Sequence, residues 1–335
     1  MLSTFIKKLE TPKKIVIIPH KNPDGDALGS CLALHFFLLK TGHSADVISP
    51  NEYPEFLNWM PGQENVINYS TANEKTVELI EKAEIIFTLD YNQLNRIGNL
   101  EPIVASSKAQ KIMIDHHENP GDYADVTYSD ASIGSTCEMV FELLHALNPI
   151  EIDKSIATCL YTGIMTDTGS FRHSNTNQKS HKIAMDCLAF DINNSKIYQS
   201  IYENKSKAQI SLLAKVIDNL RFDLEGMVAS FIITKKMIDD SGIIPGDVDG
   251  FTDFVRSING VEIAIMVCEN EAGKHRVNFR SKGKYVINDI AKSFGGGGHK
   301  FAAGASAEGK SDIILQNILD KTFSVIDVQN KTSMQ

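Results

Sequence analysis

Residues 14–30 read KIVIIPHKNPDGDALGS, and this stretch decides the fold expected for the first half of the chain. Its first six residues are an apolar run rich in Ile and Val, with little alternation between polar and apolar side chains. Such runs are typical of parallel strands that are buried on both faces. A polar loop follows, and a helical pattern then extends over residues 27–40. The stretch therefore predicts the strand, loop and helix with which a doubly wound α/β domain begins.

The same two patterns alternate through the rest of the first half. Apolar runs that predict further strands lie at residues 45–49, 84–90 and 111–117. Helical periodicity fills the intervals between and after them, for example at residues 135–147 and 152–165. We therefore expect residues 1–192 to form an α/β domain with a mainly parallel, doubly wound sheet.

The second half predicts a smaller α/β domain behind a helical linker. Residues 193–224 have a polar helical pattern without a strand signal, so we expect them to form the linker, and residues 225–330 to form the second domain. Predicted strands lie at residues 227–234, 261–269 and 274–281, and predicted helices at residues 247–257 and 287–293. The tail after Val328 is expected to fray.

Length and composition limit the class of protein. A chain of 335 residues favours two domains, and 42% hydrophobic with 22% charged residues excludes disordered, collagen-like and coiled-coil classes. The longest strongly apolar stretch, residues 31–39, is far shorter than the roughly 20 residues of a transmembrane helix. No signal-peptide pattern is present, so a cytoplasmic location is expected. The five cysteines form no C-x-x-C pair and are expected to be buried free thiols.

The charge distribution indicates a small anionic ligand. A net charge of -9 disfavours a protein that coats duplex nucleic acid. Residues 273–300, however, hold seven Lys or Arg against one acidic residue, a local balance of +6 that leaves -15 for the rest. A basic patch on an acidic protein indicates a short anionic ligand bound at one place. A solvated strand face is the alternative explanation of the charge alone.

Side chains with metal-binding chemistry follow the predicted strands of the first domain. They are His20, Asp24 and Asp26 after the first strand, Asp90, Asp115, His116 and His117 at later strand ends, and Asp167 beside a glycine turn. Taken alone, the H-x-x-x-D-x-D pattern is equally well explained by a turn and a helix N-cap. Ligands, however, gather outside the carboxyl ends of strands in open α/β sheets, and carboxylates that converge there would repel one another without cations. Oxygen ligands with a few imidazoles suit Mn²⁺ or Mg²⁺, and two ions that share a carboxylate fit the number of ligands.

These ordered motifs resemble those of the DHH phosphoesterase superfamily, which also contains RecJ-type nucleases and the family II inorganic pyrophosphatases. The resemblance extends over about the first 190 residues. In the second half, the sequences FRS at 279–281, GGGGH at 295–299 and AAG at 302–304 resemble the DHH-associated domain of the nanoRNase and pAp-phosphatase branch. The two segments together cover nearly the whole chain.

The resemblance implies a phosphoesterase that hydrolyses short oligoribonucleotides to mononucleotides, and 3′-phosphoadenosine 5′-phosphate (pAp) to AMP. Two divalent ions, with Mn²⁺ preferred and Mg²⁺ accepted, would activate a water for in-line attack and neutralise the phosphate oxygens. One ion would be held by His20, Asp24 and Asp90, and the other by Asp26, Asp90, His116 and Asp167. Asp115 would orient an imidazole, and His117 would donate a hydrogen bond or a proton to the substrate.

Substrate contacts are expected in both domains. The resemblance implies that Arg280, Ser281, Gly297, Gly298 and His299 bind substrate. The glycine run lacks the Ser or Thr of a Walker A motif, and its alternative explanation is a flexible linker. Beside basic residues, we expect it to let backbone N–H groups approach a phosphate or a base. Arg172 is a further candidate for phosphate binding, with an ordinary surface arginine as the alternative.

Two other functions stay open at this point. One is a phosphodiesterase for cyclic dinucleotides or their linear products, which the superfamily also contains. The other is a non-catalytic nucleotide sensor, which is disfavoured because all six metal ligands are present. A pyrophosphatase is disfavoured because that family has a different C-terminal domain. The expected partners are a short single-stranded RNA or pAp and no membrane; the oligomeric state is open, with a homodimer among the options.

Overall fold

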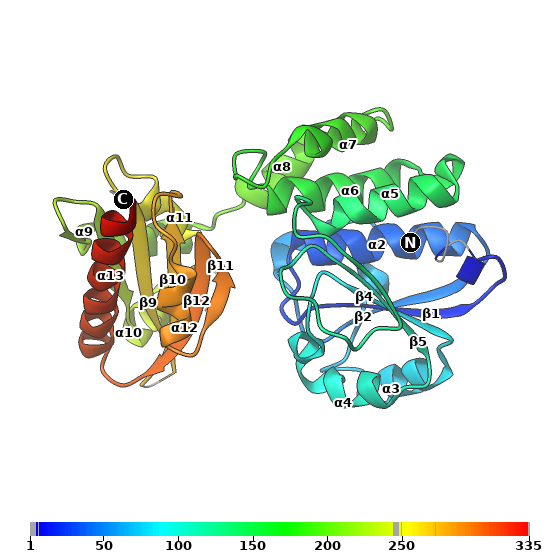
Figure 1. Cartoon of the computed structure of the whole chain (residues 1–335), viewed down its shortest axis with the longest axis horizontal. Coiled ribbons are helices and arrows are strands. Elements are labelled where there is room, and N and C mark those ends of the chain that lie inside the picture. The colour runs from blue at the N-terminus through cyan, green and yellow to red at the C-terminus, as the bar shows by residue number, and fades with distance from the viewer. Residues whose placement is uncertain (1–4, 6, 244–247, 249, 272, 334–335) are drawn as a thin grey trace. The chain divides into compact units, whose positions relative to one another are not determined.

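The apolar run that opens the motif stretch forms strand β1, Lys14–Pro19, inside a six-stranded sheet. The computed structural model describes residues 5, 7–243, 248, 250–271 and 273–333. Its chain divides into two units, Met1–Asn204 and Lys205–Gln335 (Figure 1). Five of the six residues of β1 are buried, as expected for a strand that is covered on both faces.

The sheet of the first unit is entirely parallel, which confirms the predicted doubly wound α/β class. The strand order is β3-β2-β1-β4-β5-β6, and each neighbouring pair is parallel. The other strands are β2 (Ser44–Ser49), β3 (Ile67–Asn68), β4 (Ile85–Leu89), β5 (Gln110–Asp115) and β6 (Val126–Ser129). Because the chain moves outward from β1 in both directions, the strand ends beside β1 and β4 lie at a topological switch point, where α/β proteins bind ligands.

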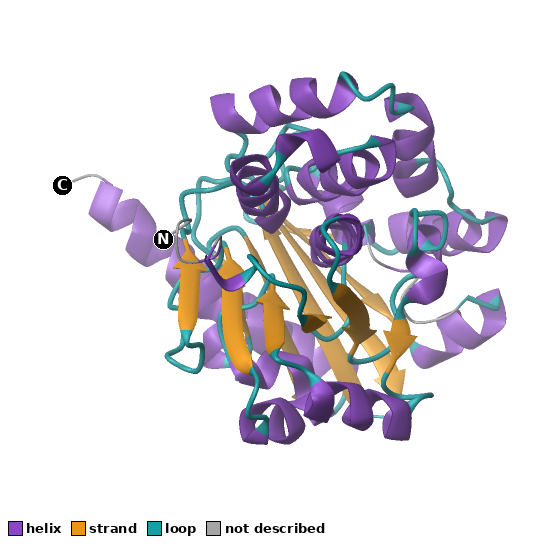
Figure 2. Cartoon of the chain, turned by 90° about the vertical axis from the view of Figure 1, so that its right-hand side faces the viewer, coloured by secondary structure: helices purple, strands orange, loops and turns teal. Residues whose placement is uncertain are grey.

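Helices cover both faces of this sheet (Figures 1 and 2). On one face lie α2 (Gly25–Lys40), α5 (Thr136–Leu147), α6 (Lys154–Asp167), α7 (Gln178–Leu188) and α8 (Asn194–Tyr202). On the other lie α3 (Asn73–Lys82), a 3-10 helix at Leu94–Leu100 and α4 (Glu101–Ser106). Shorter 3-10 helices lie at Glu55–Leu57, Gln63–Asn65 and Pro149–Glu151. Each face thus has its own hydrophobic core, and the polar residues of the first unit's candidate site lie at the strand ends.

The second unit contains a mixed six-stranded sheet in the order β11-β12-β10-β9-β8-β7. Its strands are β7 (Arg221–Asp223), β8 (Val228–Ile233), β9 (Ile263–Glu271), β10 (Lys274–Ser281), β11 (Gly297–His299) and β12 (Ala302–Glu308). Strands β8 and β9 are parallel and the other neighbours are antiparallel. The three strands predicted from the sequence are β8, β9 and β10, whereas β7 was not expected.

Two groups of helices pack on opposite faces of this second sheet. One face carries α9 (Lys207–Asp218), α10 (Lys235–Ser241) and α11 (Phe251–Arg256), and the other carries α12 (Asn288–Ser293) and α13 (Ser311–Ser333). The helix predicted at residues 247–257 begins outside the described residues, at 247 and 249. None of the helices formed by the described residues combines the length and the apolar character needed to cross a membrane.

The expected fraying of the tail after Val328 is wrong as far as Ser333, because α13 continues to that residue, and residues 334 and 335 lie outside the described residues. The Gln329 side chain donates to the carbonyl of Val286 and accepts from its N–H, at 2.9 and 3.0 Å. Asn330 accepts a hydrogen bond from the hydroxyl of Tyr285 at 3.0 Å. These contacts with a distant part of the chain hold the last turns of the helix in place.

The predicted linker at residues 193–224 is divided between the two cores. Helix α8 packs Ile197 and Ile201 into the first unit, whereas α9 packs Leu212 and Val216 into the second. The predicted domain limits stay a prediction. All five cysteines are buried and unbonded, which confirms the prediction of free thiols.

Candidate metal centre

Asp24 and His20 lie in the loop between β1 and α2. Asp24 is the N-cap of α2, and its Oδ1 accepts hydrogen bonds from the N–H groups of Asp26 and Ala27, both at 3.0 Å. Its other oxygen, Oδ2, lies 3.9 Å from His20 Nε2. The two explanations of the H-x-x-x-D-x-D pattern therefore apply together, because one oxygen caps the helix and the other faces the cluster.

Asp26 lies in the first turn of α2 and is fully buried. Its two oxygens accept hydrogen bonds from the backbone N–H groups of Thr136, at 2.7 Å, and Cys137, at 2.9 Å. These N–H groups belong to the first turn of α5, where a helix leaves donors without partners. Burial and the charge of Asp90 raise the pKa of Asp26 well above its usual range.

Gly163 of α6 makes room for this carboxylate. A Cβ at this position would lie 2.2 Å from Cys137 Sγ and 2.8 Å from Asp26 Oδ1. Gly29 of α2 likewise allows close contact, since a Cβ there would lie 2.6 Å from the carbonyl oxygen of Cys159. The two glycines therefore let α2, α5 and α6 approach closely enough to hold Asp26 in place.

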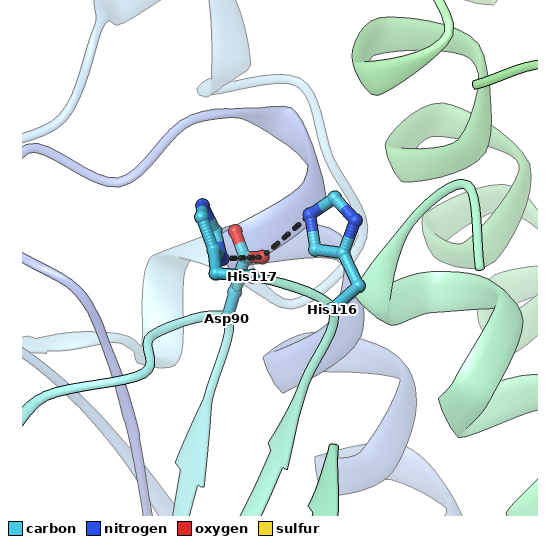
Figure 3. Close-up of side chains that lie close together, drawn as sticks. All are labelled: Asp90, His116 and His117. Atoms are coloured by element: carbon cyan, nitrogen blue, oxygen red, sulfur yellow. Dashed lines mark ion pairs between the residues drawn. The ribbon is translucent and has the colours of Figure 1, made fainter. Parts of the chain in front are cut away.

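Asp90 follows β4 and lies between three imidazoles. Its Oδ2 is 3.4 Å from His20 Nε2, and its Oδ1 is 3.5 Å from His116 Nε2 and 3.9 Å from His117 Nδ1 (Figure 3). The hydroxyl of Thr136 donates a hydrogen bond to the same Oδ1 at 2.9 Å. Burial opposes ionisation, but the hydrogen bond from His20 and the nearby imidazoles outweigh it, so the pKa of Asp90 lies below its usual range.

Asp90 is also one of few non-glycine residues with a left-handed backbone, with a φ of 68°. Such a conformation is uncommon for residues other than Gly, Asn and Asp, and it is found at functional sites. It turns the chain sharply at the carboxyl end of β4.

His116 and His117 follow β5 and point to opposite sides of Asp90 (Figure 3). His116 Nε2 lies 3.8 Å from Asp167 Oδ2 and 4.0 Å from Asp26 Oδ2. Burial lowers the pKa of His116, but the charges of Asp167, Asp90 and Asp26 raise it to about 9. The same balance of burial against carboxylates raises the pKa of His20 to about 9.

Asp115 is fully buried and holds His117. Its Oδ1 lies 2.7 Å from His117 Nδ1, a hydrogen bond that fixes the ring, whereas its Oδ2 has no partner within the described residues. The imidazole that Asp115 orients is thus His117. This arrangement places a proton on Nδ1 of His117 by inference from the hydrogen bond.

Asp167 ends α6 and is held by a residue that the sequence did not suggest. Asn175 donates from Nδ2 to Asp167 Oδ2 at 3.0 Å, and to the carbonyl of Gly134 at 2.9 Å. Burial and the charges of Asp24 and Asp90 raise the pKa of Asp167 to about 7, against the effect of His116. Thr136 was not among the predicted site residues either, although the sequence predicted a helix that begins at residue 135.

The ligand atoms of seven residues form three overlapping groups. Within each group the atoms lie within 4.8 Å of one another. The first group is His20, Asp24 and Asp90, and the second is Asp26, His116 and Asp167. The third group is Asp90, His116 and His117. The first two correspond to the sets expected from the sequence, with Asp90 between them. The raised pKa values of the buried Asp26 and Asp167 indicate negative charge that the surrounding protein does not fully compensate, and that cations would stabilise. Oxygen and imidazole donors of this kind fit Mn²⁺ or Mg²⁺.

Arg172 lies in the loop after Asp167, outside these three groups. Its Nε donates to the carbonyl of Gly169 at 2.7 Å, and the residue is exposed. Gly169, Ser170 and Phe171 are consecutive left-handed residues with φ of 55°, 60° and 63°. The three residues before Arg172 therefore have a backbone conformation that most side chains disfavour.

In the second unit, the register of the sheet brings Arg280 and His299 into one row. Both residues pair with Ala302 of β12, from β10 on one side and from β11 on the other. Arg280 donates from Nε to Asp253 Oδ2 at 3.3 Å. Ser281, in contrast, is only 1% exposed and accepts a hydrogen bond from the N–H of Gly283 at 3.2 Å. The row therefore combines two candidate substrate residues, whereas Ser281 stabilises a turn.

The glycine run forms part of a paired strand rather than a linker. A Cβ at Gly296 would lie 2.1 Å from the carbonyl oxygen of Gly304, and one at Gly298 would lie 2.6 Å from that of Ala302. Gly297 has open space where its Cβ would be. Gly296 and Gly298 are thus needed for the close approach of β12.

Comparison with known proteins gives matches along most of the chain. Residues 14–164 match the DHH family, N-terminal domain, and residues 225–326 match the DHHA1 domain. The bifunctional oligoribonuclease and PAP phosphatase NrnA of Thermus thermophilus is 29% identical over 309 residues, which cover 92% of this chain and 88% of that protein.

Solved structures agree with these matches. The crystal structure of an exopolyphosphatase-related protein from Bacteroides fragilis has a TM-score of 0.90 and 35% sequence identity, and the alignment covers 96% of this chain and 95% of that one. Exonuclease RecJ bound to manganese has a TM-score of 0.53 with 14% identity, over 95% of this chain and 93% of that one, which is a likeness in fold.

Proposed function

Because the chain belongs to the DHH family and carries a DHHA1 domain, we propose that it is a metal-dependent phosphoesterase that hydrolyses short oligoribonucleotides to mononucleotides and pAp to AMP. The observation that carries this proposal is the convergence of four carboxylates and three imidazoles from strand ends and helix termini of the first unit. The Thermus thermophilus relative is named for both activities.

Two divalent ions are proposed for the centre. His20, Asp24 and Asp90 would hold one, and Asp26, Asp90, His116 and Asp167 the other, with Mn²⁺ preferred over Mg²⁺. When bound, such ions neutralise phosphate oxygens and activate water. The mixture of imidazole and carboxylate supports manganese, and the RecJ structure of the same fold is bound to manganese.

The protein's own groups supply orientation and a proton. Hydrolysis joins a water oxygen to phosphorus, breaks an ester P–O bond and places a proton on the departing oxygen. His117, held at Nδ1 by Asp115, donates from Nε2 to a phosphate oxygen or to the departing oxygen when the ring is doubly protonated. The hydrogen bonds to Asp26, Asp90 and Asp167 keep these carboxylates in position through the reaction.

The second unit is proposed to bind a phosphate or a base of the substrate. Arg280 and His299 share a row of the sheet, with the small residue Ala302 between them. The basic patch at residues 273–300 supplies the positive charge that a terminal phosphate requires. Gly297 leaves its backbone open to a ligand, and Gly298 shapes the strand beside it. Arg172, which is exposed near Asp167, is proposed as a further phosphate contact. A substrate contact of Ser281 stays a prediction.

A panel of four substrates tests the proposal. Purified protein with Mn²⁺ is assayed against pAp, a 5′-phosphorylated dinucleotide, a 24-nucleotide RNA and cyclic-di-AMP. We expect turnover of pAp and the dinucleotide, and slower cleavage of the long RNA, because the positive patch is confined and the rest of the chain is acidic. Turnover of cyclic-di-AMP alone would favour the cyclic-dinucleotide phosphodiesterase, and nucleotide binding without any turnover would favour the sensor.

A cytoplasmic location and a homodimer stay predictions. Cell fractionation and light scattering of the purified protein would test them, independently of the activity.

A further inference from the structure

The first unit contains a pocket of about 340 Å³ whose lining includes Lys21, the residue that follows the candidate ligand His20. Its walls come from the loops that follow β1 and β2, from the segment after β3 and from the 3-10 helix at Leu94–Leu100. The residues on which the argument depends are Lys21, Pro50, Tyr69, Asn73, Ile97 and Asn99. All of them lie in the first unit, and none belongs to the groups of metal-binding atoms.

The pocket is tied directly to the loop of the metal centre. Lys21 follows the candidate ligand His20, and its backbone N–H donates to the carbonyl of Arg96 at 2.8 Å. The next residue, Asn22, exchanges two hydrogen bonds with the side chain of Asn51, at 2.7 and 2.8 Å. One peptide unit therefore joins a lining residue of the pocket to a candidate metal ligand, and consecutive Cα atoms are about 3.8 Å apart.

The lining has the chemistry of a nucleoside site. Pro50 and Ile97 are buried and apolar, and the ring of Tyr69 is half-buried. Asn73 and Asn99 are exposed at the rim, and within the part of the chain that the structure describes their side-chain amides make no hydrogen bond, so they face solvent and can reach a ligand. Aromatic rings stack on bases, and free amides donate to and accept from base edges. The volume is at the lower end of small-molecule sites and suits one nucleoside rather than two.

The charge of the pocket lining indicates which part of the substrate the pocket suits. Among the six residues above, only Lys21 is charged, and its ammonium group has no ion pair or hydrogen bond with other described residues. A terminal phosphate monoester carries more negative charge than a diester, and the several cations of the second unit would bind it more strongly than one lysine. The pocket thus fits a nucleoside that is joined to a single phosphate.

We propose that this pocket binds the nucleoside joined to the scissile phosphate through its 5′ oxygen. This proposal rests on the proposed function, and it assigns the pocket to one of the two proposed substrates and not to the other. In pAp the 3′-phosphate carries one nucleoside, whereas the corresponding phosphate of a dinucleotide carries a second nucleoside, which is attached through its own 5′ oxygen. The pocket therefore serves oligonucleotides and is not used by pAp.

Paired rate measurements on Tyr69→Ala test the division. We expect kcat/KM for the dinucleotide pApA to fall by roughly tenfold to a hundredfold, the usual effect of losing a stacking residue. The value for pAp should stay within about twofold. Tyr69→Leu, which keeps an apolar side chain, guards against a folding defect, and Tyr198→Ala, at a tyrosine that is 40% exposed on α8, is the matched control.

Equal losses on both substrates, or no loss on either, would overturn the pocket assignment. Failure of the unmodified protein to hydrolyse pAp and pApA would instead overturn the proposed function, so the two failures are distinguishable.

A binding measurement without turnover completes the test. AMP carries its phosphate on the 5′ oxygen and represents the nucleotide proposed for the pocket. In protein labelled with ¹⁵N-asparagine, we expect AMP to shift the side-chain signals of Asn73 and Asn99, and ribose 5-phosphate to leave them in place. Tyr69→Ala should weaken the AMP shift. Absence of a shift at millimolar AMP, or an equal shift with ribose 5-phosphate, would contradict a nucleoside site.

Discussion

The two units place their candidate residues in different ways. In the first unit, ligands come from strand ends and helix termini that are distant in sequence, and buried hydrogen bonds hold several of them, as at Asp26 and Asp90. In the second unit, Arg280 and His299 lie on strands, and the register of the sheet sets their spacing. The first arrangement fixes individual atoms, which chemistry requires. The second fixes a row of side chains, which is enough to capture a charged group.

Removing metal should have the largest effect of all. Because the first unit's carboxylates are arranged around a shared centre, we expect excess EDTA to abolish turnover of pAp and pApA. Mn²⁺ should restore it better than Mg²⁺. Initial rates across a metal titration measure this, and full hydrolysis in excess EDTA would refute the two-metal proposal.

Asp90→Ala should be the most damaging change of a single ligand. This carboxylate lies between His20 and His116 and would serve both ions. Changes outside the ligand shell cost about tenfold to a hundredfold, so we expect a loss of more than about a hundredfold here. Asp24→Ala, which affects one proposed ion, is the comparison. Near-normal rates for Asp90→Ala beside an inactive Asp24→Ala would show that Asp90 does not bridge.

Arg280→Ala should lower kcat/KM by roughly tenfold to a hundredfold if it holds a phosphate, because the contact is charge-assisted. The loss should be larger for pAp and pApA than for a chromogenic phosphodiester that lacks a second anchoring group. His299→Ala should behave in the same direction, and Arg221→Ala, an exposed arginine of the same unit, is the control.

Arg280 also pairs with Asp253, so the melting temperature must be measured as well. Equal losses on all substrates together with a lowered melting temperature would mean that the row only stabilises the second unit.

Asn175→Ala should give the smallest of these effects on the chemistry. It removes the donor to Asp167, and we expect the affinity for Mn²⁺ to fall by roughly tenfold to a hundredfold. Asn177→Ala provides a matched control, since Asn177 caps α7 and, among the described residues, makes no hydrogen bond to a candidate metal ligand. It should lower the melting temperature and leave Mn²⁺ affinity unchanged. An equal effect of both variants on affinity would show that Asn175 acts only through stability.

Local sequence was sufficient where the pattern is strong. Strand β1 and strand β10 have the predicted limits, and the ligands that follow strands are recognisable because strand ends are marked by a change from apolar to charged residues. Strands β3 and β6 were missed, because they are edge strands of two and four residues that are only half-buried. An edge strand receives little of the burial that produces an apolar run.

Strand β12 was missed for another reason. Its sequence, AAGASAE, contains no β-branched or aromatic residue, and alanine and glycine are depleted in strands. The small side chains of β12 are explained by its neighbour β11, because Gly296 and Gly298 bring the β11 backbone close to β12. Thr136 and Asn175 were beyond sequence reasoning as well. Thr136 bonds a carboxylate 110 residues away, and only the folded chain brings the two together.

The buried position of Asp26 links ligand binding to folding. This carboxylate lies in the hydrophobic interior where α2, α5 and α6 meet, next to two other carboxylates that share its surroundings. A cation that binds only the native arrangement adds its binding free energy to the unfolding free energy of the first unit. If the proposed ions bind here, the centre would contribute to the stability of the first unit as well as to the proposed reaction. Adding Mn²⁺ would then raise the melting temperature of the first unit as well as the rate.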